Sequence, residues 1–298
     1  GGAVADRFLS ELGYGNEIMK ISKVINNNVL SAFDENGQEV VLMGRGLGFK
    51  AKTGDDIDES RVQKVFCIEN SALSRQFQEM ISNIPMEHMQ ISADIISYAK
   101  NECGMELNQS IYVALTDHIN FAIERYRNGI ALSNAILWEI RQFYRREYLV
   151  GEYALRLFAE RLDIHFPEDE AGFIALHFVN AEYNTDIHDT YMITDVIQKG
   201  IEIVKAEYQK ALDEKSMHYE RFVAHLKFFA RRIFFSKEML SDEEQEFSDL
   251  IELKYPREYA CARKIADYIE AQYDCTVTKE EIMYLAIHIR RITTDSDE

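Results

Sequence analysis

The segments HINFAIER (118–125) and EDEAGFIALH (168–177) return later in the chain as HLKFFARR (225–232) and KEEIMYLAIH (279–288). Position 225 lies 107 residues after position 118, and position 288 lies 111 residues after position 177. A repeat of this length has the size of a small domain and is too long for a solenoid repeat. The sequence therefore predicts two copies of one domain, each carrying two histidines.

The two copies match at more positions than the histidines. The matched pairs are His118 and His225, Phe121 and Phe228, Arg125 and Arg232, Glu170 and Glu281, Phe173 and Tyr284, Ala175 and Ala286, and His177 and His288. Each arginine follows its histidine by seven residues, or about two helical turns, so both side chains share a helix face. Because helical side chains lean toward the N-terminus, Arg125 and Arg232 are candidates to support a phosphorylated imidazole. A solvated arginine is the alternative.

The chemical role of the four histidines has three candidate explanations. A single histidine on an amphipathic helix is usually structural, but two matching pairs favour a shared function. Metal binding is disfavoured because the Glu-x-x-His signature of di-iron bundles and the HExxH motif are both missing. Nucleotide and hydrolase motifs are missing too, so we expect no metal, no cofactor and no enzymatic activity. The unmatched histidines, expected on the surface or in packing, are His88, His165, His188 and His218.

Composition and charge restrict where a nucleic acid could bind. Only 3 prolines and 14 glycines occur in 298 residues, and 47% of the residues are hydrophobic, which indicates a mainly helical protein with packed cores. The four cysteines lack CxxC spacing and suggest a reducing, cytoplasmic location, and no apolar run predicts membrane insertion. Residues 19–70 have a net charge of −1 and residues 71–298 one of −15. Only the N-terminal segment is therefore a candidate for binding RNA or DNA.

The N-terminal segment has the pattern of short β-strands. The runs are ISKVI, NVLSAF, EVVLM and QKVFCI, and Asn36-Gly37 between two of them predicts a hairpin with a type I′ turn. From about Ala72 the periodicity becomes helical, with one apolar face at Ile91, Ile95, Ile96 and Ala99 and another at Ile111, Leu115, Ile119 and Ala122. Breaks are expected near Pro85 and at 184–190. Residues 1–18 are interpreted as a tag or an upstream extension.

The β segment also contains residue types that suit RNA. Amides from Asn26 to Asn28 can read base edges, Lys23 and Arg45 can bind phosphate, and an exposed Phe49 can stack on an unpaired base. The alternatives are that the asparagines form a turn between two strands and that Phe49 lies in the core.

Several long motifs resemble one known family. MKISKVINNNVL, MGRGLGF, SIYVALTDHINFAIER, EDEAGFIALHFVNAE and YERFVAHLKFFARRI are similar to segments of the transcription antiterminators of bacterial beta-glucoside and sucrose operons, the BglG/LicT/SacY family. The resemblance runs from Met19 almost to the end. It implies a co-antiterminator RNA-binding β domain (19–74) and two helical phosphotransferase-system regulation domains (75–187 and 188–298). The implied fold is mainly α with a small N-terminal antiparallel β domain and two duplicated helical bundles.

The resemblance also implies sites and partners. The implied RNA-binding residues are Lys23, Asn26, Asn28, Gly44, Arg45 and Phe49, and the implied phosphorylation sites are His118, His177, His225 and His288. The implied partners are an antiterminator hairpin in leader mRNA, the histidine-containing phosphocarrier protein, a sugar-specific permease (enzyme II) and a second copy of the chain. Two rival functions are a DNA-binding activator with the same regulation domains, which needs a helix-turn-helix, and a helical His/carboxylate metalloenzyme.

Overall fold

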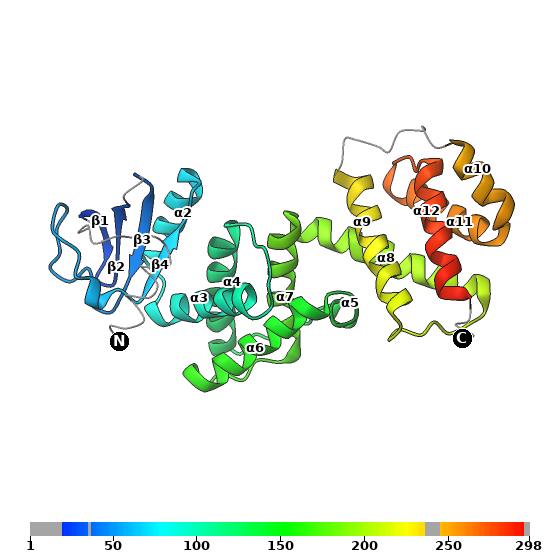
Figure 1. Ribbon diagram of the computed structural model, residues 1–298. Helices are drawn as coiled ribbons and strands as arrows, with labels where there is room; N and C mark the ends of the chain where they lie inside the picture. Colours follow the sequence, from blue (N-terminus) through cyan, green and yellow to red (C-terminus); the bar gives the residue numbers. More distant parts are fainter. Residues whose placement is uncertain (1–19, 35–36, 236–244, 295–298) are drawn as a thin grey trace. The chain divides into compact units, whose positions relative to one another are not determined.

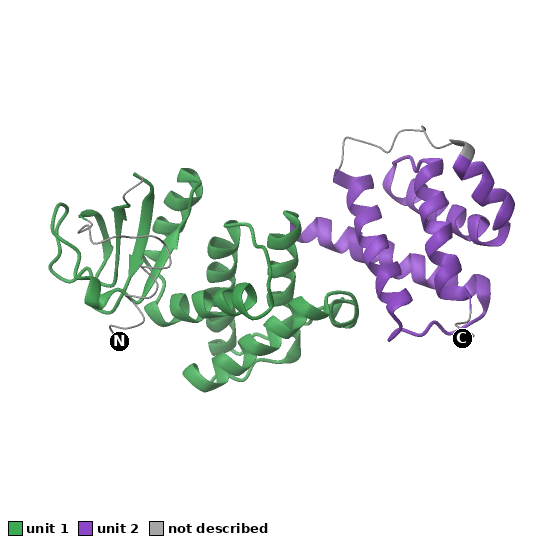
Figure 2. Ribbon diagram, in the orientation of Figure 1, with its two compact units in different colours: residues 1–185 green, residues 186–298 purple. Residues whose placement is uncertain are grey.

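The computed structural model describes residues 20–34, 37–235 and 245–294 of the chain. The chain divides into two compact units, residues 1–185 and 186–298, which Figure 2 colours separately. The first unit contains a β-sheet followed by helices, and the described part of the second unit is helical (Figure 1). The expected fold class, mainly α with a small N-terminal antiparallel β domain, is confirmed.

Four short antiparallel strands form the sheet, in the order β1-β2-β3-β4. They are β1 (Ile21–Asn26), β2 (Val29–Phe33), β3 (Glu39–Met43) and β4 (Lys64–Cys67), one in each of the four apolar runs. Leu30 pairs with Leu42 and Ala32 with Val40, so apolar side chains meet across the strands. The four strands were therefore correctly placed from the sequence.

The connection between β2 and β3 contains the Asn36-Gly37 pair, for which the sequence predicts a type I′ turn. Residues 34–38 connect the strands, and the Asp34 N–H donates to the Gln38 carbonyl oxygen at 2.9 Å. The Asp34 carboxylate in turn accepts the Gln38 N–H at 2.7 Å. Gly37 has the expected positive φ, 76°, whereas Asn36 lies outside the described residues. The backbone and side chain of Asp34 therefore join the two ends of this connection.

Two different parts of the chain bury the two faces of the sheet. One face packs against the β3–β4 connection, which includes the 3₁₀ helix η1 (Glu59–Arg61) and contributes Leu47, Ile57 and Val62. The other face packs against α2 (Ser71–Ile81) and α3 (Met86–Asn101), and the Phe66 and Phe77 rings lie 5.1 Å apart. Because both faces are covered, β3 reads EVVLM without polar alternation. Helix α2 lies beside the sheet in Figure 1.

Five helices form the rest of the described part of the first unit. They are α3, α4 (Ser110–Arg127), α5 (Leu137–Phe143), α6 (Arg145–Leu162) and α7 (Glu168–Tyr183). The two apolar faces predicted on α3 and α4 are buried in one core. Helices α6 and α7 approach closely at Gly151, where a Cβ atom would lie 2.2 Å from the Ala171 carbonyl oxygen. Only glycine allows this approach, which fixes α7 against α6.

Helices also form the described part of the second unit. They are α8 (Ile187–Tyr208), α9 (Met217–Phe235), α10 (Gln245–Lys254), α11 (Pro256–Tyr273) and α12 (Lys279–Thr293). The core contains fully buried Phe222, Phe229 and Leu285 from α9 and α12. Thr278 caps α12 by accepting the Glu281 N–H at 3.3 Å. No described helix is both long enough and apolar enough to cross a bilayer.

Candidate functional sites

The rings of the two matched histidines of the first bundle lie next to each other and are tilted. His118 lies on α4 and His177 on α7, and their ring centroids are 4.6 Å apart with an interplanar angle of 48°. Phe173, one helical turn before His177, lies 6.4 Å from the His118 ring. The structure therefore brings together two residues that are 59 positions apart in the sequence.

A buried carboxylate organises this first histidine site. Glu170 lies seven residues, or about two turns, before His177, so both share one face of α7. Its Oε1 lies 2.6 Å from His118 Nε2, and its Oε2 accepts a hydrogen bond from Arg125 Nη2 at 3.2 Å. Glu170 is only 5% exposed. One carboxylate is thus shared between the histidine and the arginine.

The second bundle repeats the arrangement with different hydrogen bonds. His225 on α9 and His288 on α12 are stacked, with ring centroids 4.2 Å apart and an interplanar angle of 21°. Arg232 donates from Nε and Nη2 to the two oxygens of Glu281, at 2.6 and 2.7 Å. Both carboxylate oxygens of Glu281 are therefore hydrogen-bonded to the arginine. His225 Nε2 is buried without a partner among the described residues.

Burial lowers the pKa of three of these four imidazoles and so favours their neutral form near pH 7. Burial, with a smaller contribution from the neighbouring His118, lowers the pKa of His177 to about 3. Burial also lowers the pKa of His225 to about 3, with smaller contributions from His288 and Arg232. The pKa of His288 is lowered by burial, Arg291 and Arg221. A neutral imidazole keeps one nitrogen lone pair, which is the form that accepts a phosphoryl group.

Both sites are flanked by an exposed phenylalanine one turn after the first histidine. Phe121 is 57% exposed and Phe228 is 52% exposed. The guanidinium of Arg125 lies 5.2 Å from the centre of the Phe121 ring. A cavity of about 200 Å³ beside the first site is lined by Arg125, Glu170 and apolar side chains including Ile130. The surface next to the first histidine site is therefore largely apolar.

The sequence reasoning gave Glu170 and Glu281 no functional role. Their equivalence in the repeat was visible, but neither lies at the spacing of a metal motif. It also expected Arg125 and Arg232 to lean toward their histidines, whereas their hydrogen bonds go to the glutamates on the facing helices. Only the packing of α4 on α7 and of α9 on α12 brings these groups together.

Three of the candidate RNA-binding residues are exposed. Phe49 is 59% exposed, so the alternative placing it in the core is wrong, and the side chains of Lys23 and Arg45 also face solvent. Within the described part of the chain, neither cation belongs to an ion pair. Lys50 adds a further cation 5.5 Å from the Phe49 ring centre. Positive charge and an accessible aromatic ring therefore lie next to each other at Phe49 and Lys50.

The loop that carries Arg45 is held in place by contacts of Asn26, Asn28 and Gly44. The Asn28 carboxamide oxygen accepts the Gly46 N–H at 2.9 Å. The Asn26 carboxamide oxygen accepts the Asn28 N–H at 2.8 Å, and its Nδ2 donates to the Ile81 carbonyl oxygen at 3.2 Å. A Cβ at Gly44 would lie 1.8 Å from a backbone oxygen of Arg61. These residues hold the loop that carries Arg45, and residues 27–28 form the turn considered from the sequence.

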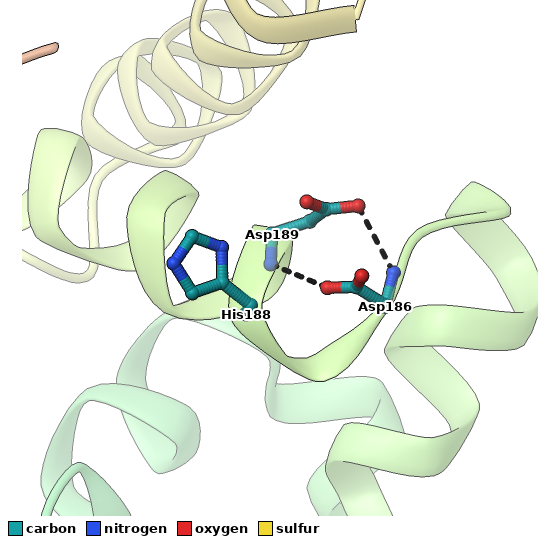
Figure 3. Close-up of side chains that lie close together, drawn as sticks. All are labelled: Asp186, His188 and Asp189. Atoms are coloured by element: carbon teal, nitrogen blue, oxygen red, sulfur yellow. Dashed lines mark hydrogen bonds between the residues drawn. The ribbon is translucent and has the colours of Figure 1, made fainter.

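The four unmatched histidines lie outside both sites. His88 is buried, with Nδ1 2.9 Å from the Asn120 carboxamide oxygen. His188 lies beside Asp186 and Asp189 in a group that could hold a metal ion (Figure 3). Each of these aspartates accepts the backbone N–H of the other, which makes them the capping box of α8. Helix capping accounts for this cluster.

The sheet with exposed basic and aromatic residues, followed by two bundles that each contain a pair of histidines, defines the class of an RNA-binding regulator with a duplicated helical domain. Family models agree with this class: residues 19–75 match the CAT RNA binding domain, and residues 93–181 and 198–292 match the PRD domain. The chain belongs to the BglG/LicT family of transcription antiterminators.

Individual relatives match along nearly the whole chain. The transcription antiterminator LicT of Bacillus subtilis is 48% identical over 92% of this chain and 99% of its own length. The beta-glucoside operon antiterminator of Dickeya chrysanthemi is 42% identical over 94% of this chain and 99% of its own length. The crystal structure of GlcT CAT-PRDI is 36% identical, covers 56% of this chain and 99% of that chain, and has a TM-score of 0.50. The DNA-binding and metalloenzyme alternatives are not favoured, since the N-terminal match is to an RNA-binding domain.

Proposed function

We propose that this antiterminator controls a beta-glucoside utilisation operon. In this proposal a homodimer binds a hairpin in the leader mRNA through the β domain and thereby prevents a terminator from forming. The name of the Dickeya chrysanthemi relative supports the operon type. The exposed Lys23, Arg45 and Phe49 support the location of the RNA surface, because cations bind phosphate and an aromatic ring stacks on an unpaired base.

Phosphorylation of the paired histidines is the proposed control. The permease of the sugar phosphotransferase system would phosphorylate His118 and His177 and so inhibit the protein when the sugar is absent. The histidine-containing phosphocarrier would phosphorylate His225 and His288 and so activate it. The observation that carries this proposal is that each bundle contains two neighbouring imidazoles beside an arginine–glutamate pair.

Electrostatics explains how a phosphoryl group would act as a switch. It adds about −1.5 to −2 charges near pH 7 and strong acceptor oxygens. Residues 71–298 already have a net charge of −15. New charge in either bundle would repel acidic surfaces or recruit arginines such as Arg125 and Arg232. The chain is the substrate of the phosphoryl donors and not itself an enzyme, and it acts in the cytoplasm, where leader transcripts are made.

RNA binding is tested by gel-shift titration of the full chain against hairpins from its own operon leader. Arg45→Ala should weaken binding about fivefold or more, since a phosphate or base contact to arginine contributes about 1–3 kcal/mol. Lys199→Ala removes the same charge from an exposed site in the second unit and should leave the affinity unchanged. Equal affinities for all three proteins, or no binding to any leader hairpin, would contradict the proposal.

The regulatory assignment is tested with an antitermination reporter in cells. Replacing His225 and His288 by Ala should abolish activation by the phosphocarrier, and replacing His118 and His177 by Ala should relieve inhibition without sugar. His165→Ala serves as the control because this exposed histidine lies outside both sites. Unchanged reporter output in both double variants would sink the assignment.

A further inference from the structure

The hydrogen bond between His118 and Glu170 determines which ring nitrogen carries the proton. An ionised carboxylate accepts hydrogen bonds and cannot donate one. Because Arg125 donates to the other oxygen of the same carboxylate, the hydrogen between Nε2 and Oε1, 2.6 Å apart, belongs to the imidazole. A neutral His118 then carries its proton on Nε2 and its lone pair on Nδ1.

Nδ1 of His118 is the ring nitrogen without a hydrogen bond to the described residues. It has no hydrogen-bond partner among the described residues, and it is not one of the buried side-chain atoms that lack a partner. It therefore keeps some contact with solvent, although the side chain as a whole is only 14% exposed. A donor that approaches the surface meets a nitrogen with a free lone pair.

We propose that Glu170 is a positioning residue that holds His118 in the Nε2–H tautomer, so that Nδ1 is the atom that accepts the phosphoryl group. This inference rests on the proposed function, because it assumes that His118 is phosphorylated. Beyond the proposed function, it identifies Nδ1 as the accepting atom and Glu170 as the residue that selects this atom. Glu170 itself does not contact the reacting phosphorus, since it binds the opposite nitrogen of the ring.

In the proposed step, a phosphohistidine of the donor protein transfers its phosphoryl group to His118. The Nδ1 lone pair of His118 forms a nitrogen–phosphorus bond while the donor's nitrogen–phosphorus bond breaks. The bonding electron pair returns to the donor ring, which takes one proton from solvent. His118 becomes a phosphoimidazolium whose Nε2–H remains hydrogen-bonded to Glu170, so the carboxylate stabilises the positive charge that develops on the ring.

The second site lacks this arrangement. Both oxygens of Glu281 accept hydrogen bonds from Arg232, and His225 Nε2 is buried without a partner among the described residues. Glu281 therefore does not select a tautomer of His225. The inference is restricted to the first site, and Glu281→Gln becomes a matched control that removes one buried carboxylate charge.

The tautomer is measured by two-bond hydrogen–nitrogen NMR correlation on the ¹⁵N-histidine-labelled full chain, with His118→Asn identifying the signals. Wild type should show the Nε2–H form. In Glu170→Gln only one side-chain oxygen remains to accept the hydrogen bonds that Arg125 and His118 donate. We therefore expect the Nδ1–H form in at least half of the molecules. Glu281→Gln should leave the His118 signals unchanged. A wild-type Nδ1–H tautomer overturns the inference even if the variants do not fold.

The accepting atom is measured with phosphoramidate as the phosphoryl donor and ¹⁵N and ³¹P NMR as the readout. Phosphate on Nδ1 of His118 in wild type, with at least a tenfold slower reaction in Glu170→Gln, would support the inference. Phosphate on Nε2 would overturn the inference and leave the proposed function intact. A chain with the Nε2–H tautomer that accepts no phosphoryl group on His118, from phosphoramidate or the carrier proteins, would overturn both.

Discussion

The two histidine sites contain the same four residues, two histidines, one arginine and one glutamate, yet their hydrogen bonds differ. In the first site Glu170 is shared between His118 and Arg125, and in the second Arg232 takes both oxygens of Glu281. The histidine pairs differ as well, since the rings meet at 48° in the first site and stack at 21° in the second. Duplicated residues therefore do not guarantee duplicated chemistry, because each polar group has alternative partners within reach.

The comparison predicts that removing the arginine costs more in the second site. Arg232→Met leaves the buried Glu281 without its two hydrogen bonds, which should cost about 3–5 kcal/mol of local stability. Arg125→Met leaves Glu170 bonded to His118 and should cost about 1.5–3 kcal/mol. Hydrogen exchange of backbone amides in α12 and in α7 reports the two losses separately. Equal losses would show that the two carboxylates are equivalent, and a larger loss in α7 would contradict the predicted order.

A smaller effect is expected from pH, and it should be similar in the two sites. In the unfolded chain His177 and His225 bind a proton near the ordinary pKa of 6.5, whereas in the folded chain each pKa is about 3. Stability is therefore lost as pH falls from 6.5 toward 3, by about 2 kcal/mol per histidine between pH 7 and pH 5.

Urea unfolding at pH 7, 6 and 5, with hydrogen exchange to separate the units, measures this loss. His177→Gln should flatten the pH dependence of α7 and leave that of α12 unchanged, and His225→Gln should do the reverse. His165→Ala, at an exposed histidine, is the control. A pH dependence that survives both glutamine variants would have to come from other groups.

The smallest predicted difference concerns the exposed phenylalanines. Phe121→Ala removes a ring that Arg125 contacts at 5.2 Å, and such a contact contributes about 0.5–1 kcal/mol at exposed sites. Among the described residues Phe228 has no such cation, so Phe228→Ala should change stability by less than about 0.5 kcal/mol. Thermal unfolding compares the two variants. A larger loss for Phe228→Ala would place an unrecognised contact at that ring.

Local patterns predicted most of the secondary structure and the histidine pairs. The four strands follow β-type runs, and the apolar faces of α3 and α4 follow helical spacing, because both depend on which side of an element meets the core. The hairpin predicted at Asn36-Gly37 is confirmed by the pairing of β2 with β3, whereas Asn36 lies outside the described residues and the type I′ geometry stays a prediction. The hydrogen bond from Asn26 to the Ile81 carbonyl was not predicted, since the two residues lie 55 positions apart.

The sequence by itself determined the repeat, the four histidines and the β segment, since these are properties of residue order and spacing. The tertiary structure decided which groups share a hydrogen bond. Whether a carboxylate binds an imidazole or a guanidinium depends on differences of about an ångström in how α4 packs on α7 and α9 on α12, because hydrogen bonds weaken steeply with distance and angle. The same packing buries the imidazoles and lowers their pKa values, and residue spacing does not reveal it.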